Sequence, residues 1–220
     1  MKRNTAVLKW AKLAAVVVTS SALFAGSAFA QLAVKAKGVQ KVELSDAISK
    51  NQISWLSDAP MEKIKGTAPN VTGSFTMNPA DMKAVTGTVS VPVKGMKTGN
   101  PIRDRHLMGK DWLDAKQFPN ITFKITSVTA ARVSGQKANL TVVGAFTCHG
   151  VTKTITAPVE VTWKEASAKT ARAPGDWIKI KTSFTIKLAD YKVAGKAGVV
   201  GNKVGDTIKI DGTLYGHTVR

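Results

Sequence analysis

The residues with the clearest capacity for chemistry are Arg103, Asp104 and His106, which lie within four positions of one another. A histidine beside a carboxylate can act as a general base, but the surrounding sequence supplies no nucleophile. On a short helix, Asp104 would lie near the positive end of the helix dipole, and Arg103 and His106 could share a face. We therefore predict no catalytic residue. We expect this group to attach the helix to the rest of the fold, and the alternative is contact of Arg103 and His106 with the polar end of a ligand.

Metal and nucleotide sites find little support. Cys148 and His149 are adjacent, so on a strand their side chains would point to opposite faces and could not bind one metal ion together. The chain has three histidines and one cysteine, which is too few for a zinc module. Gly195, Gly198 and Gly201 match neither a dinucleotide-binding nor a P-loop pattern. The sequence predicts no metal site and no cofactor.

The charge of the chain is strongly basic. Its 220 residues include 32 Lys and Arg against 14 Asp and Glu, which gives a formal net charge of +18. Such a charge attracts anionic partners without naming one. Nucleic-acid modules combine clustered basic residues with stacking aromatic side chains, whereas here the lysines are scattered and the arginines few. We predict no nucleic-acid binding and expect a solvated basic surface that could contact anionic lipid head groups.

The first 30 residues resemble a secretory leader. Basic residues precede an apolar stretch over 13–24, and the small-x-small sequence AFA follows at 28–30. The apolar stretch is shorter than the roughly 20 residues that a membrane-spanning helix needs. We therefore predict a signal peptide over 1–30 and a single mature domain over 31–220, in the periplasm or secreted. In an oxidising compartment the lone Cys148 is expected to be buried.

The mature sequence alternates apolar and polar residues with a period of two between glycine, proline and asparagine turns, which is typical of antiparallel strands. Strands are expected in 71–77, 85–93, 121–126, 140–148, 151–163, 178–188 and 208–214. Seven or more such strands predict an all-β antiparallel barrel, and a two-sheet sandwich is the alternative. Glycines on the apolar faces, at Gly73, Gly144 and Gly212, favour the barrel because they allow tight bending or close approach to the backbone.

One segment departs from the strand pattern. Asn100 can cap a helix whose first residue is Pro101 and which ends at Gly109, and a second short helical start is expected at Asp111, before Pro119. A helical insert near residues 100–116 could close one mouth of a barrel.

Two motifs carry a family resemblance. The first is NPIRDRHL at 100–107, followed by DWLD at 111–114 and FPNITF at 118–123, and the second is GAFTCHGVTK at 144–153. Together they resemble the YceI-like family, over about 71–215. The resemblance implies a lipocalin-like barrel of about eight strands around an elongated apolar cavity that holds a polyisoprenoid or a similar amphiphile. Residues 31–70 match the family's opening strands poorly.

The interpretation is therefore a lipid-binding barrel that carries or sequesters a polyisoprenoid or isoprenoid-quinone-like lipid without catalysis. Barrels of this size either pack their own side chains or hold a ligand. The residues expected to contact the ligand are Phe75, Arg103, His106, Leu107, Trp112, Phe123, Val142, Phe146, Phe184 and Ile186. Simple core packing is the alternative for the apolar ones. A homodimer and peripheral contact with an anionic membrane are compatible with this interpretation.

A different class of function is the main alternative. A basic envelope protein could bind anionic polymer or membrane through its lysine-rich faces, with a solid barrel core as a scaffold. Binding of that kind should weaken steeply as salt rises, whereas apolar burial should persist.

Overall fold

The computed structural model describes residues 31–219, so the predicted signal peptide over 1–30 lies outside the described residues. The strands are β1 Gln40–Leu44, β2 Gln52–Asp58, β3 Lys63–Ala68, β4 Thr72–Asn78, β5 Asp81–Pro92, β6 Asn120–Ser134, β7 Lys137–Cys148, β8 Val151–Lys164, β9 Trp177–Lys187 and β10 Thr207–Val219. The helix α1 is Pro101–Leu107, and the short 3-10 helices are η1 Ala168–Thr170 and η2 Leu188–Tyr191. No helix in this part of the chain is long and apolar enough to cross a membrane.

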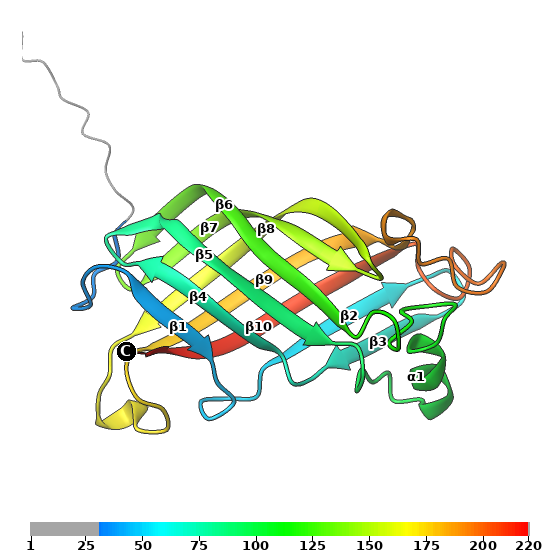
Figure 1. Cartoon of the computed structure of the whole chain (residues 1–220), viewed down its shortest axis with the longest axis horizontal. Helices are drawn as coiled ribbons and strands as arrows, with labels where there is room; N and C mark the ends of the chain where they lie inside the picture. The colour runs from blue at the N-terminus through cyan, green and yellow to red at the C-terminus, as the bar shows by residue number, and fades with distance from the viewer. Residues whose placement is uncertain (1–30, 220) are drawn as a thin grey trace, which may run out of the picture.

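The strands close into a barrel (Figure 1). Eight of them run β1-β4-β5-β6-β7-β8-β9-β10, each antiparallel to its neighbour, and β1 pairs with the end of β10 to complete the circle. The predicted antiparallel barrel of about eight strands is therefore confirmed, and the two-sheet sandwich is wrong.

The remaining two strands form an extension of the barrel wall. β2 pairs with the first half of β10, over Ile208–Thr213, while β1 pairs with its last residues, over Gly216–Val219. β3 then pairs with β2 and is bridged to the segment before α1 through Thr67 and Lys97. The region 31–70 therefore both closes the barrel, through β1, and lengthens its wall towards α1, through β2 and β3 (Figure 1).

Alternation places the apolar side chains inside the barrel. On β7, Val142, Gly144, Phe146 and Cys148 are buried while the residues between them are partly exposed. At Gly144 a Cβ atom would come within 2.4 Å of the Phe123 ring and 2.7 Å of a backbone oxygen. The glycine therefore lets an aromatic ring lie directly on the strand, which is the close approach that its position predicts.

One end of the barrel is closed by packed side chains. The segment before β1 crosses this end, where Leu32 is buried and its N–H donates to the Pro79 carbonyl at 2.7 Å. Trp163 is fully buried in the same cluster, and its indole N–H donates to the Asp176 carboxylate at 2.8 Å. Since Leu32 and Trp163 fill the core here, any opening must lie at the other end.

The helical insert lies at that other end (Figure 1). Asn100 caps α1 by accepting hydrogen bonds from the backbone N–H groups of Ile102 and Arg103, with Pro101 at the first helical position. The second helical start expected at Asp111 is wrong, because residues 109–117 form successive turns. The physical reason is Asp114, whose positive φ of 42° is incompatible with a right-handed helix.

Candidate functional site

The barrel encloses a cavity of about 460 Å³. Its wall consists mainly of inward-facing apolar side chains, and it extends from Val161 and Leu214 in the closed half of the barrel to Ile102 on α1. A volume of this size is typical of small-molecule sites. Because the exposed residues Ile102 and His106 belong to its lining, the cavity opens to solvent beside α1. The barrel is hollow, which contradicts the solid core of the basic-scaffold alternative.

The structure brings all the residues expected to contact a ligand to the wall of this one cavity. These are Phe75, Arg103, His106, Leu107, Trp112, Phe123, Val142, Phe146, Phe184 and Ile186. Strand alternation supplies the side chains from β4, β6, β7 and β9, and the insert supplies the remainder. Their contact with a ligand stays a prediction.

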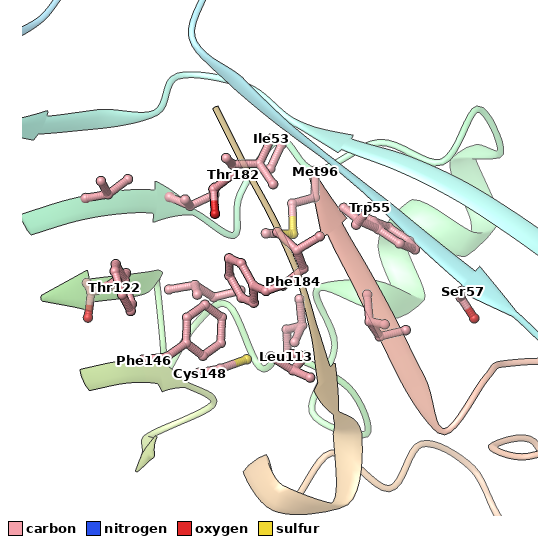
Figure 2. A pocket seen from close by; sticks show the side chains of 18 of the residues that line it. Ile53, Trp55, Ser57, Met96, Leu113, Thr122, Phe146, Cys148, Thr182 and Phe184 are labelled. Atoms are coloured by element: carbon pink, nitrogen blue, oxygen red, sulfur yellow. The ribbon is translucent and has the colours of Figure 1, made fainter. Parts of the chain in front are cut away.

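The wall also contains residues that sequence reasoning missed. Ile53, Trp55 and Ser57 alternate along β2 and face the cavity, together with Met96 from the segment before α1 (Figure 2). The period-two spacing of these β2 residues is the sequence signal that could have indicated their common inward face. The Trp55 indole lies directly against Gly66 of β3, where a Cβ atom would come within 2.2 Å of the ring. Gly66 therefore gives the tryptophan its place at the cavity wall.

An aromatic cluster lies in the half of the barrel that faces the mouth, with a thiol beside it. The Phe146 ring packs edge-to-face on Phe184 at 5.8 Å between centroids (Figure 2). It packs in the same way on Tyr191, at 5.4 Å. Cys148 is buried beside them, as predicted, and burial raises the pKa of its thiol to about 12. Burial likewise raises the pKa of the Tyr191 hydroxyl to about 12. Both groups are thus neutral at physiological pH, and Cys148, which belongs to the cavity wall, adds no charge to its apolar lining.

The mouth of the cavity carries most of its polar lining. Arg103 forms an ion pair with Glu62 in the turn between β2 and β3, and its Nε donates to Thr98 Oγ1 at 3.1 Å. Asp104 is buried and accepts hydrogen bonds from the backbone N–H and the hydroxyl of Thr98, each at 2.7 Å. Lys97 Nζ lies 4.0 Å from the same carboxylate. Arg103 thus attaches α1 to the β2–β3 turn, and Asp104 attaches it to the segment that precedes the helix.

The candidate acid–base group does not assemble at this mouth. The Asp104 carboxylate is turned towards Thr98, while His106 is exposed on the cavity side of α1. The Thr98 hydroxyl bond, with smaller contributions from its N–H, Lys97 and Arg103, lowers the pKa of Asp104 although burial opposes this. The carboxylate is therefore ionised and engaged in holding the helix.

Asp104→Asn is expected to lower the melting temperature by a few degrees at pH 7, because the amide loses the charge-assisted bonds to Thr98. The folded-state pKa of Asp104 lies below its ordinary value of 3.8, so its contribution to stability is present above that value and is lost as pH falls through the folded pKa. The difference between wild type and variant should shrink below about pH 4. Thermal unfolding followed by circular dichroism between pH 7 and 3 measures this.

Asp111→Asn is the matched control for that substitution, because Asp111 is exposed on the same insert. It should leave the melting temperature nearly unchanged at both pH values. A constant difference between wild type and Asp104→Asn across the pH range would contradict the assigned role of the Asp104 carboxylate.

His149 lies in a tight turn between β7 and β8, not on the strand as expected. Its φ is +49° and that of Gly150 is +73°. The His149 ring packs edge-on against Phe118 at 4.9 Å, and its Nδ1 lies 3.1 Å from the Tyr191 carbonyl oxygen. His149 therefore helps to hold η2 against this turn.

Across residues 31–219, no three His, Cys, Asp or Glu side chains group together as metal ligands would.

A closed antiparallel barrel with an apolar interior, open at one end, has the architecture of lipocalin-like barrels. The family model of the YceI-like domain matches residues 29–215, and the chain belongs to the YceI-like family. The match includes 31–70, so the family extends further towards the N-terminus than the two motifs indicated. A UPF0312 protein of Vibrio cholerae is 34% identical over 92 residues, covering 42% of this chain and 47% of that protein. This chain therefore spans about half the length of that relative. A UPF0312 protein of Yersinia enterocolitica is 27% identical over 151 residues, covering 67% of this chain and 72% of that protein.

Solved structures share the fold. BcnA of Burkholderia cenocepacia superposes with a TM-score of 0.61 at 23% identity, covering 75% of this chain and 95% of BcnA. A YceI protein of Campylobacter jejuni gives 0.59 at 20% identity, covering 74% and 89%. A polyisoprenoid binding domain from Saccharophagus degradans gives 0.57 at 16% identity, covering 81% and 98%.

Proposed function

We propose that this protein binds a long apolar lipid, such as a polyisoprenoid or an isoprenoid quinone, inside the barrel, and carries or sequesters it without catalysis. The observation that supports the proposal is the apolar cavity that extends along the barrel. Its polar lining is concentrated at the mouth beside α1. That distribution fits a molecule with an apolar chain and one polar end. The polyisoprenoid binding domain from Saccharophagus degradans has the same fold.

The driving force would be burial of the lipid chain. Each Å² of apolar surface removed from water contributes roughly 25 cal/mol, so a chain that fills the cavity can be held with few polar contacts. The half-exposed Arg103 and exposed His106 would then face the polar end of the lipid. Because an apolar wall discriminates weakly between chains of similar width, we expect selectivity among related lipids to be loose.

The proposed location is the periplasm, where a lipid must be shielded from water between membranes. Two features support it: the leader-like sequence over 1–30, and the burial of Cys148, the single cysteine of the chain, away from oxidants.

Native mass spectrometry of protein purified gently from its own cells tests the proposal, followed by organic extraction and identification of what is released. We expect an isoprenoid or quinone-like mass in a near-stoichiometric amount. A protein that is empty and takes up no added polyprenol would overturn the proposal.

A further inference from the structure

Two exposed apolar side chains lie at the mouth of the cavity. Met61, in the turn between β2 and β3, is 72% exposed, and Ile102, in the first turn of α1, is 57% exposed. The third large apolar side chain that is exposed in the described region, Val39, directly precedes β1 at the closed end (Figure 1). An exposed methionine and isoleucine on two different elements beside one opening point to an interaction surface.

These two side chains belong to one connected structure, the mouth rim, which we define as residues 59–62, 100–106 and 192–205. The ion pair between Glu62 and Arg103 joins the β2–β3 turn to α1, directly beside both apolar residues. The Met61 N–H donates to the Asn202 carbonyl at 3.1 Å, which joins the same turn to the loop over 192–205. The rim therefore carries Met61 and Ile102 on segments that are joined to each other around the opening.

The loop over 192–205 in the mouth rim is basic and rich in small residues. Between Lys192 and Gly205 it contains three lysines and six Gly or Ala residues, four of them exposed, and no acidic residue. Lys196 and Lys203 are exposed, and Lys203 also borders the cavity. Apolar side chains that enter the head-group region beside lysines that attract anionic lipid are the pattern of a peripheral membrane surface.

We propose that the mouth rim docks on an anionic phospholipid bilayer, with Met61 and Ile102 inserted among the head groups and Lys196 and Lys203 against their phosphates. The proposal rests on the proposed function, because docking places the opening of the lipid cavity against the bilayer. A lipid chain then passes between bilayer and barrel without exposure to water, which would otherwise oppose the transfer.

Cosedimentation of the mature protein with vesicles tests the apolar contribution. The vesicles contain phosphatidylethanolamine and phosphatidylglycerol in about a 3:1 ratio, and phosphatidylcholine vesicles serve as the uncharged comparison. Met61→Asp with Ile102→Asp is expected to weaken binding to the anionic vesicles at least tenfold, because two inserted apolar groups become charged. Val39→Asp, at a side chain that is 70% exposed at the closed end, is the charge-matched control for Met61→Asp alone, at a side chain that is 72% exposed. Val39→Asp should change binding less than twofold, and Met61→Asp alone should weaken binding more than Val39→Asp does.

A second pair of variants tests the electrostatic contribution. Each lysine near an anionic surface strengthens binding roughly fivefold. Lys196→Glu with Lys203→Glu should therefore weaken binding more than tenfold. Lys37→Glu with Lys169→Glu makes the same change in net charge at exposed positions of the closed end and should weaken it less than threefold.

Wild-type protein that fails to bind the anionic vesicles at low salt would overturn the docking proposal. So would closed-end variants that bind as weakly as the mouth-rim variants. Native mass spectrometry of the same samples separates this outcome from failure of the proposed function. Lipid-loaded protein that does not dock overturns docking alone, whereas protein that docks but never holds lipid supports docking and overturns the carrier function.

Discussion

Replacing Val91 by tryptophan is expected to abolish lipid uptake while leaving the barrel folded. Val91 lies on β5, half-buried, and its side chain borders the cavity opposite its cross-strand partner Ile121. An indole at this position would project into the space that a lipid chain needs. Because that space is empty of side chains, the added bulk should cost about 1 kcal/mol or less in unfolding free energy, at the low end of the overpacking range. Affinity for a polyprenol should fall by at least about 100-fold.

The matched control is Thr88→Trp, which adds the same indole to the exposed outer face of the same strand. Binding of a polyprenol by native mass spectrometry and stability by urea unfolding should be measured for both variants. Thr88→Trp should bind as wild type does. If Val91→Trp folds and binds polyprenol with unchanged affinity, the ligand lies outside the cavity.

Most of the barrel could be predicted because its strands are local patterns. On β7 and β9, less and more buried residues alternate along the strand, and apolar residues occupy most of the inner positions, Thr182 being an exception, so the inner face is readable from sequence. β6 is less regular: its pairing with β7 shifts after Ile125 and again after Val128, and each β-bulge changes which residues face inward. The sequence pattern stops at Thr126 for this reason, although the strand continues to Ser134.

The closure of the barrel could not be predicted in the same way. β10 shares one edge between β1 and β2, and which strand pairs with which half depends on residues more than 150 positions apart. Period-two alternation identifies a strand but carries no information about its partner. The sequence therefore indicated a barrel through strand number and glycines, while the extension by β2 and β3 required the structure.

The same distinction separates the two parts of the candidate site. The side walls follow from alternation, so Phe123, Val142 and Phe184 were expected at the cavity. The mouth depends on contacts between distant segments, such as Glu62 with Arg103. Because surface ion pairs follow from tertiary geometry and not from local spacing, sequence reasoning found the Arg103 end of this pair and missed the other.

The Cys148 thiol is expected to react about 1,000-fold more slowly with iodoacetamide at pH 8 in the folded protein than in urea. Thiolate is the reactive form, and burial raises the pKa of this thiol from 9.0 to about 12. At pH 8 that leaves roughly one thiol in 10,000 ionised, against about one in ten for an ordinary cysteine. Mass spectrometry of samples quenched over time measures the two rates.

Moving the thiol by one position supplies the control. In the double variant Cys148→Ala, Thr147→Cys, the thiol lies on the outer face of β7, because successive side chains of a strand alternate. It should react at close to the unfolded rate. Equal rates for Cys148 and for this displaced thiol in the folded state would show that position 148 is open to water, and the apolar lining proposed for lipid binding would then be incomplete at its aromatic cluster.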